Sequence, residues 1–218
     1  MIDYAQARLT MVESQLRTNK VTDDALLDAF LAVPRERFVP PGLRGTAYVD
    51  DDLPLGNGRA LMEPMVLARL LQVAEIGRGD RVLEIGCATG YGTAILSRLA
   101  RSVVAIESDV DLARLAMARL RELGVGNAAV VEAPLAGGYP GRAPYDAIVF
   151  QGAAMQIPAV IGQQLADRGR LVAVLQQPNG IARAVLMTAA GGVLSQRPCF
   201  DAVARLLPGF SAEPSFVF

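Results

Sequence analysis

One stretch of the chain, VLEIGCATGYGTAIL (residues 82–96), constrains the fold more than any other. Apolar strand-forming residues lead into a turn of small residues, and a helix pattern follows. A strand, a glycine-rich turn and a helix in this order are typical of the first unit of a parallel sheet. Because ligands bind beyond the carboxyl ends of the strands in such sheets, the turn is the first candidate for a binding site.

The sequence after residue 79 alternates between strand and helix patterns. This alternation predicts an α/β fold, a doubly wound and mostly parallel sheet of seven strands with helices on both faces. The last two strands form an antiparallel hairpin around Gly191 and Gly192. We expect strands at 81–85, 102–107, 127–132, 145–150, 169–175, 183–188 and 192–200, and helices at 91–99, 110–123 and 157–165.

Residues 1–79 have a different pattern, which we interpret as an N-terminal helical cap with a loop on the substrate side. Helices are predicted at 4–17, 23–33 and 64–73. Thr22 is the expected N-cap of the second helix, and Pro34 ends it. Prolines and glycines predict a long irregular segment before the third helix. The expected organisation is therefore 1–79 for these helices and loop, and 80–218 for an α/β core with a C-terminal hairpin and tail.

Composition excludes several classes of function. The net charge of −1 gives no electrostatic basis for binding nucleic acid or an anionic membrane. No apolar run approaches the ~20 residues of a membrane helix and no signal-peptide pattern is present, so we expect a cytoplasmic protein. The absence of histidine excludes Ser-His-Asp and Cys-His catalysis. Cys87 and Cys199 lie far apart in the sequence and form no CxxC pair, and we expect no metal site.

The turn distinguishes between kinds of nucleotide cofactor. The dinucleotide fingerprint G-x-G-x-x-G fits in neither register, because its last glycine would fall on Tyr91 or Ile95. No Gly-Lys-Ser/Thr follows, which excludes a P-loop. The turn reads instead as acid-x-Gly-x-Ala-x-Gly, and it resembles motif I of class I methyltransferases that use S-adenosylmethionine. The positions of this pattern are Glu84, Gly86, Ala88 and Gly90.

Each part of this pattern has a predicted role. Small residues let the backbone approach a cofactor closely. Glu107 ends the next strand, where a carboxylate accepts hydrogen bonds from ribose hydroxyls. We predict that Glu84 orients the methionine end of S-adenosylmethionine and that Glu107 binds its ribose. The predicted cofactor-binding residues are Ala60, Leu61, Glu84, Gly86, Cys87, Ala88, Gly90, Glu107, Ser108 and Gln151.

Four segments extend the resemblance to the protein-L-isoaspartate O-methyltransferase family. They are AVPRERFVP, DLPLGNGRALMEPMVLARLLQ, DRVLEIGCATGYGTAIL and APYDAIVFQGAAMQIP, in the family's order. The resemblance implies a Rossmann-like class I methyltransferase fold with N-terminal helices over the cofactor. It also implies methyl transfer to the carboxylate of an isoaspartyl residue, so that the partner is a protein or peptide with a carboxylate. Since carboxylates with a pKa near ~4 are already ionised at neutral pH, this reaction requires no histidine base.

The chain departs from the family at three places. The family's T-I-S-x-P, whose serine lies near the transferring methyl, reads ALMEP here, so Met62 takes the serine's place and Glu63 follows it. The family's G-D-G, whose aspartate contacts adenine, reads APL at residues 133–135. The tail, ARLLPGFSAEPSFVF, does not resemble the family's closing segment.

Met62 and Glu63 are therefore the candidate catalytic positions, with two interpretations. In the first, Met62 packs in the core and Glu63 begins a helix, where its charge suits the helix dipole. In the second, Glu63 faces the methyl group and selects a neutral or cationic acceptor, because two carboxylates at about 4 Å repel by about 4 kcal/mol near a protein surface. The alternative functions are an S-adenosylmethionine-binding protein without catalysis and a nucleotide-dependent oxidoreductase, which the turn disfavours.

Overall fold

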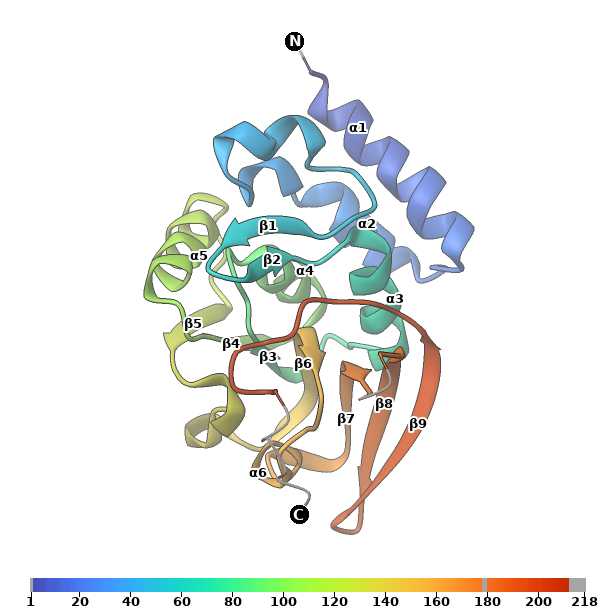
Figure 1. Cartoon of the computed structure of the whole chain (residues 1–218), viewed down its shortest axis with the longest axis vertical. Coiled ribbons are helices and arrows are strands. Elements are labelled where there is room, and N and C mark those ends of the chain that lie inside the picture. Colours follow the sequence, from blue (N-terminus) through green and yellow to red (C-terminus); the bar gives the residue numbers. More distant parts are fainter. Residues whose placement is uncertain (1, 178–179, 212–218) are drawn as a thin grey trace.

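A seven-stranded sheet in the order β5-β4-β3-β6-β7-β8-β9 forms the centre of the structure, a computed structural model that describes residues 2–177 and 180–211 (Figure 1). The first five strands in this order pair in parallel, and β8 and β9 are antiparallel. The predicted doubly wound, mostly parallel α/β sheet is thus confirmed. The strands are β3 (Arg81–Ile85), β4 (Ser102–Glu107), β5 (Ala128–Glu132), β6 (Tyr145–Ala154), β7 (Leu165–Gln176), β8 (Ala182–Ala190) and β9 (Val193–Asp201).

The two faces of the sheet are covered differently. Helices α3 (Pro64–Ala74), α4 (Tyr91–Leu99) and α5 (Val110–Glu122) pack on one face, where Val82, Val103 and Val149 point. The other face carries Leu83, Ile106 and Phe150 and is covered by short elements and by the C-terminal segment. These short elements are α6 (Ala159–Gly162) and the 3₁₀ helices Leu135–Gly137 and Pro140–Arg142. Alternate residues of β3, β6 and β7 therefore enter two separate apolar clusters.

The N-terminal helices join the first of these clusters. Helix α1 (Tyr4–Met11) continues as a π-helical turn, Val12–Leu16, and a 3₁₀ turn, Arg17–Asn19, so the predicted helix is present but changes type. Helix α2 (Asp24–Ala32) packs against α4, and α3 packs against β6 and β7. The helices before residue 79 and the sheet after it therefore share one hydrophobic core.

Two local predictions are wrong. Asp23, not Thr22, caps α2, because the Asp23 carboxylate accepts a hydrogen bond from the Leu26 amide at 3.0 Å. The predicted helix over 157–165 is only the four residues of α6. Beyond it, Leu165 pairs with Tyr145 in the sheet, so the tertiary contact prevails over local propensity.

The segment predicted as irregular contains two 3₁₀ helices, Arg35–Arg37 and Pro41–Thr46, and a hairpin that the sequence pattern did not indicate. This hairpin pairs β1 (Leu53–Gly56) with β2 (Arg59–Leu61). Its tip, Asn57 and Gly58, has left-handed backbone conformations with φ of 51° and 72°. The hairpin lies above β3 and β4 in Figure 1, and its Arg59 bonds to Glu107, the last residue of β4.

The observed cap of α2 gives a direct test of the local structure. We expect Asp23→Ala to lower the free energy of unfolding by about 1 kcal/mol, because it removes the acceptor for an otherwise unpaired amide. Thr22→Ala is the matched control, since the Thr22 side chain is exposed and makes no capping bond. Urea unfolding of both variants measures the difference, and equal losses would contradict the assigned cap.

Candidate functional site

The glycine-rich turn after β3 is held close to the end of β4. The amides of Gly86 and Cys87 both donate to the Ile106 carbonyl, at 2.9 and 3.1 Å. Gly86, Ala88 and Gly90 have positive φ of 79°, 50° and 90°, respectively. Glycine adopts such angles without strain, and Ala88 is the one residue of the three with a side chain. Small residues therefore keep the backbone of the turn, which is buried, close to the carboxyl ends of β3 and β4.

Glu107, at the end of β4, is the fixed carboxylate of this turn. Its Oε2 accepts from the Ala88 amide at 2.7 Å, and its Oε1 accepts from the amides of Ser108 and Asp109 at 2.8 and 3.1 Å. The Glu107 side chain is fully buried. Three backbone donors therefore hold the carboxylate in one orientation beside the turn.

Arg59, from the β1–β2 hairpin, completes the environment of Glu107. Arg59 Nη2 donates to Glu107 Oε2 at 2.7 Å and to the Gly86 carbonyl at 2.9 Å. Only 2% of the Arg59 side chain is exposed, so this is a buried ion pair. At the tip of the same hairpin, Asn57 donates to Asp109 Oδ2 at 2.9 Å. The hairpin is thus bonded both to the glycine-rich turn and to the residues between β4 and α5.

The C-terminal segment also reaches the turn. The Ala153 amide donates to the Arg205 carbonyl at 2.7 Å, and the Leu207 amide donates to the Ala153 carbonyl at 2.9 Å. The segment therefore runs along the end of β6, below the hairpin in Figure 1. Its Leu207 side chain is buried against Gly86 and Gly152. Residues 212–218 of the tail lie outside the described residues.

Glu84 and Gln151 lie together beneath the first turn of α4. Thr93 Oγ1 donates to Glu84 Oε2 at 2.5 Å, and the Gln151 side chain also hydrogen-bonds to the Glu84 carboxylate. Burial raises the pKa of Glu84 to about 7, against the lowering effect of the hydrogen bonds from Thr93 and Gln151. Space for the two side chains comes from Gly92, since a Cβ there would lie 2.0 Å from Gln151 Nε2 and 2.3 Å from Glu84 Oε1.

The predicted acceptor side consists of β2 and the residues that lead into α3. Ala60, Leu61 and Met62 are all buried, and Met62 belongs to the apolar core. The Met62 carbonyl accepts from Arg35 Nη2 at 2.8 Å. Glu63 is the N-cap residue of α3, although its side chain makes no capping bond. In this arrangement Met62 packs in the core and Glu63 precedes the first turn of α3.

Acidic residues surround Glu63. The Glu63 amide donates to Asp52 Oδ1 at 2.9 Å, and the Arg205 amide also bonds to the Asp52 carboxylate. Partial burial, followed by the charges of Asp50, Asp52 and Asp51, raises the pKa of Glu63 to about 7. Burial likewise raises the pKa of Asp52. An anionic group would meet like charges at this place.

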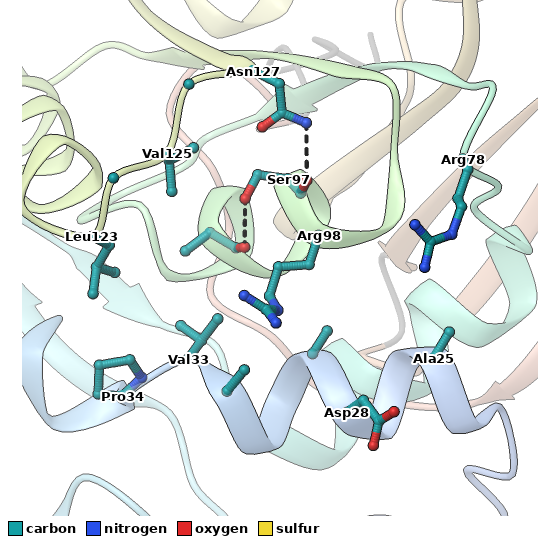
Figure 2. Close-up of a pocket in the computed structure, with 15 residues that line it drawn as sticks. Ala25, Asp28, Val33, Pro34, Arg78, Ser97, Arg98, Leu123, Val125 and Asn127 are labelled. Carbon is teal, nitrogen blue, oxygen red and sulfur yellow. Dashed lines mark hydrogen bonds between the residues drawn. The ribbon is translucent and has the colours of Figure 1, made fainter.

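Large cavities lie away from the turn. One of about 530 Å³ lies between α2, the last turn of α4 and the loop before β5, with Arg78 and Arg98 at its rim (Figure 2). The cavity that adjoins Arg59 measures about 170 Å³ and is also lined by Asp52 and Arg205. Pockets that bind small molecules or cofactors commonly measure about 300–1,000 Å³. The turn is therefore covered by the chain's own side chains.

The structure brings most of the predicted cofactor residues to one place. Glu84, Gly86, Cys87, Ala88, Gly90, Glu107, Ser108 and Gln151 lie at the turn or directly beneath it. Ala60 and Leu61 follow Arg59 on β2. Sequence reasoning missed Arg59, Gly92 and Leu207. An arginine inside the otherwise small and apolar segment GNGRALM was the available signal for Arg59, because such a residue needs a carboxylate partner.

Comparison with known proteins identifies relatives over most of the chain. The sequence model of the family described as "Protein-L-isoaspartate(D-aspartate) O-methyltransferase" matches residues 7–200. The protein-L-isoaspartate O-methyltransferase of Methylorubrum extorquens is 43% identical over 178 residues, which are 82% of this chain and 78% of the relative. The enzyme of the same name from Koribacter versatilis is 36% identical over 188 residues, 86% of this chain and 85% of the relative.

Solved structures share the fold. A protein-L-isoaspartate O-methyltransferase superposes with a TM-score of 0.82 at 24% identity, and the match covers 93% of this chain and 66% of that one. A Plasmodium falciparum protein assigned to the same activity, in complex with S-adenosyl-L-homocysteine, superposes with a TM-score of 0.80 at 17% identity. That match covers 95% of this chain and 99% of the other.

Gly92→Ala tests the packing beneath α4. Glycine to alanine inside a helix normally stabilises by about 0.5–1 kcal/mol. Here we expect a loss of about 1–3 kcal/mol, because the new Cβ would collide with Gln151 and Glu84. Gly42→Ala, in an exposed 3₁₀ helix with no atom within 4 Å of the new Cβ, is the control. Chemical denaturation measures both, and a stabilised Gly92→Ala protein would contradict this packing.

The raised pKa of Glu84 predicts a pH dependence of stability. The folded protein holds the proton up to about pH 7, whereas the unfolded chain releases it near the ordinary value of 4.5. The contribution of this group to the free energy of unfolding therefore falls as pH rises from about 4.5 to about 7. We expect Glu84→Gln to remove that part of the fall, and Glu132→Gln, at an exposed carboxylate, to leave it unchanged. Parallel pH profiles for the wild type and Glu84→Gln would contradict the buried state of Glu84.

Proposed function

This chain belongs to the protein-L-isoaspartate(D-aspartate) O-methyltransferase family, and we propose from that premise that it is an S-adenosylmethionine-dependent methyltransferase. The proposed acceptor is a carboxylate on a damaged protein or peptide. The observation that carries the proposal is the Glu107 carboxylate, fixed by three backbone amides beside a turn of small residues. A ribose with two adjacent hydroxyls matches a carboxylate in this position.

The residues of the turn fit the cofactor in kind. Gly86 leaves one side of the backbone free of a Cβ, and Glu107 lies within hydrogen-bond distance of the Ala88 amide. The buried Glu84 and Gln151 supply polar atoms beneath the turn. In the conformation described here, however, Arg59 and Leu207 lie where the cofactor would approach, so they must move before it binds.

The chain's own contribution to methyl transfer is binding and orientation. When bound, S-adenosylmethionine supplies an electrophilic methyl group on a positively charged sulfur. The chain has no histidine, and a carboxylate acceptor needs none because it is ionised at neutral pH. Residues 60–63 would line the acceptor side and exclude water from it. Exclusion of water and alignment of the acceptor carboxylate are then the main sources of rate enhancement.

A second candidate function is binding of the same cofactor with a different acceptor or without catalysis. The observations that favour it are the buried Met62 and the acidic residues around Glu63. Methionine donates no hydrogen bond, and Asp50, Asp52 and Glu63 would repel an isoaspartyl carboxylate. The acceptor of this second function would be neutral or cationic.

The helices and the acidic side chains of the described residues bear on location and partners. None of the helices in the described part of the chain is long and apolar enough to cross a membrane. Within residues 2–177 and 180–211, no group of three or more Cys, Asp or Glu side chains is placed to hold a metal ion. We propose a cytoplasmic enzyme whose partner is a protein or peptide, without nucleic acid or membrane partners.

Methyl transfer to an isoaspartyl peptide tests the function directly. At a saturating concentration of methyl donor, we expect weak turnover by the wild type and at least tenfold more by Met62→Ser/Glu63→Gln. The double change restores a donor and removes one negative charge. The same peptide with ordinary aspartate is the control substrate, and Glu107→Gln is the control for cofactor binding. Rapid turnover by the wild type would show that Met62 and Glu63 do not limit the reaction.

A further inference from the structure

The side chains of Arg59 and Leu207 pack against Gly86. They occupy the space in which a Cβ would lie if this residue were not glycine. A Cβ at Gly86 would lie 2.8 Å from Leu207 Cδ2 and 3.1 Å from Arg59 Nη2. A Cβ at Gly152, at the end of β6, would lie 2.7 Å from the same leucine. Both glycines are therefore in direct contact with atoms of the chain at the place where small residues admit a ligand in this fold.

Both carboxylate oxygens of Glu107 already accept hydrogen bonds from the chain. Oε2 accepts from Arg59 and Ala88, and Oε1 accepts from the amides of Ser108 and Asp109. A carboxylate offers about four acceptor sites, so none remains for a further pair of hydroxyls. The Ser108 hydroxyl also donates to Oε1, at 3.4 Å, so Arg59 and Ser108 are the two side-chain donors. Of the two, only Arg59 belongs to the hairpin, and it can leave without unfolding the turn.

We propose that Arg59 and Leu207 form an internal plug that determines the affinity of the cofactor site. The inference rests on the proposed function, because it takes the turn and Glu107 as the seat of a ribose-bearing sulfonium cofactor. Binding requires that the Arg59 guanidinium leave Glu107 and that the Leu207 side chain leave Gly86. The two residues thus compete with the cofactor for the same atoms and the same space.

The two halves of the plug are attached to different segments. Arg59 follows the hairpin tip, whose contact with α5 is the exposed bond from Asn57 to Asp109. The small cavity beside Arg59 is lined by Asp52, whose carboxylate offers a partner to a displaced guanidinium. Arg59 Nε has no partner within the described residues, so the buried arginine is incompletely paired where it now lies.

Leu207 is held by backbone pairing to β6. Bonds join Ala153 to Arg205 and to Leu207, and Met155 donates to the Phe210 carbonyl at 2.9 Å. Phe210 also packs edge-to-face on Phe150, with ring centroids 5.2 Å apart. A change of the Leu207 side chain alone leaves these bonds in place, which separates its effect from that of the segment as a whole.

Competition of this kind weakens apparent binding by the fraction of molecules in which the site is open. Calorimetric titration with S-adenosylhomocysteine, which cannot react, measures that apparent affinity. We expect Arg59→Gln and Leu207→Ala each to bind at least tenfold more tightly than the wild type. Arg37→Gln is the matched control, because it breaks the exposed pair of Arg37 with Glu122 and should bind as the wild type does.

The outcomes separate this inference from the proposed function. Equal or weaker binding by both variants, with a wild type that binds S-adenosylhomocysteine, would overturn the plug and leave the proposed function standing. Failure of every folded variant to bind would overturn both. Thermal unfolding followed by circular dichroism establishes that each variant is folded.

Hydrogen exchange of the wild type gives the same test without substitution, should Arg59→Gln fail to fold. The Leu207 amide is protected by its bond to the Ala153 carbonyl. At saturating S-adenosylhomocysteine, departure of Leu207 from Gly86 together with its backbone segment breaks this bond, and it predicts faster exchange at the Leu207 amide. Unchanged or slower exchange there, with Leu207→Ala binding as the wild type does, would contradict the plug.

Discussion

The buried ion pair between Arg59 and Glu107 is the contact on which the organisation of the site depends. Both side chains are removed from water and lie 2.7 Å apart. Burial of two charges is costly, and it is tolerated here because three backbone amides also bond to Glu107. Loss of one partner of such a pair typically costs about 3–5 kcal/mol, since the other charge is left buried and unpaired. The β1–β2 hairpin is therefore attached to the glycine-rich turn by charge as well as by apolar packing.

The chain keeps the fold of its family although its own side chains cover the glycine-rich turn. The plug is built from two segments at which the chain departs from the family pattern, the stretch around ALMEP and the C-terminal tail. The α/β core, which carries the turn and Glu107, keeps the fold of the solved methyltransferases. Met62, Glu63 and Arg59 all belong to the first of these segments, so the proposed selection of the acceptor and the proposed control of cofactor access would both reside there.

Local patterns in the sequence predicted the sheet, most of the helices and the residues of the turn. They succeed because buried strands and amphipathic helices repeat with fixed periods, and because positive φ favours small residues. Asp23 and Thr22 compete for one cap, and a pattern alone does not choose between them. Arg59 and Glu107 are 48 residues apart in the chain, and no periodicity relates them. Leu207 was missed for the same reason, since only the pairing of its segment with β6 brings it to Gly86. Local order was therefore predictable, whereas contacts between distant segments were not.

The position of the Arg59 guanidinium, with and without cofactor product, tests the account most directly. Crystal structures of the same protein alone and in complex with S-adenosylhomocysteine would give it. The account predicts that Arg59 contacts Glu107 in the protein alone, and that ribose hydroxyls replace the guanidinium on that carboxylate in the complex. A complex in which Arg59 stays on Glu107 while S-adenosylhomocysteine occupies the turn would contradict it.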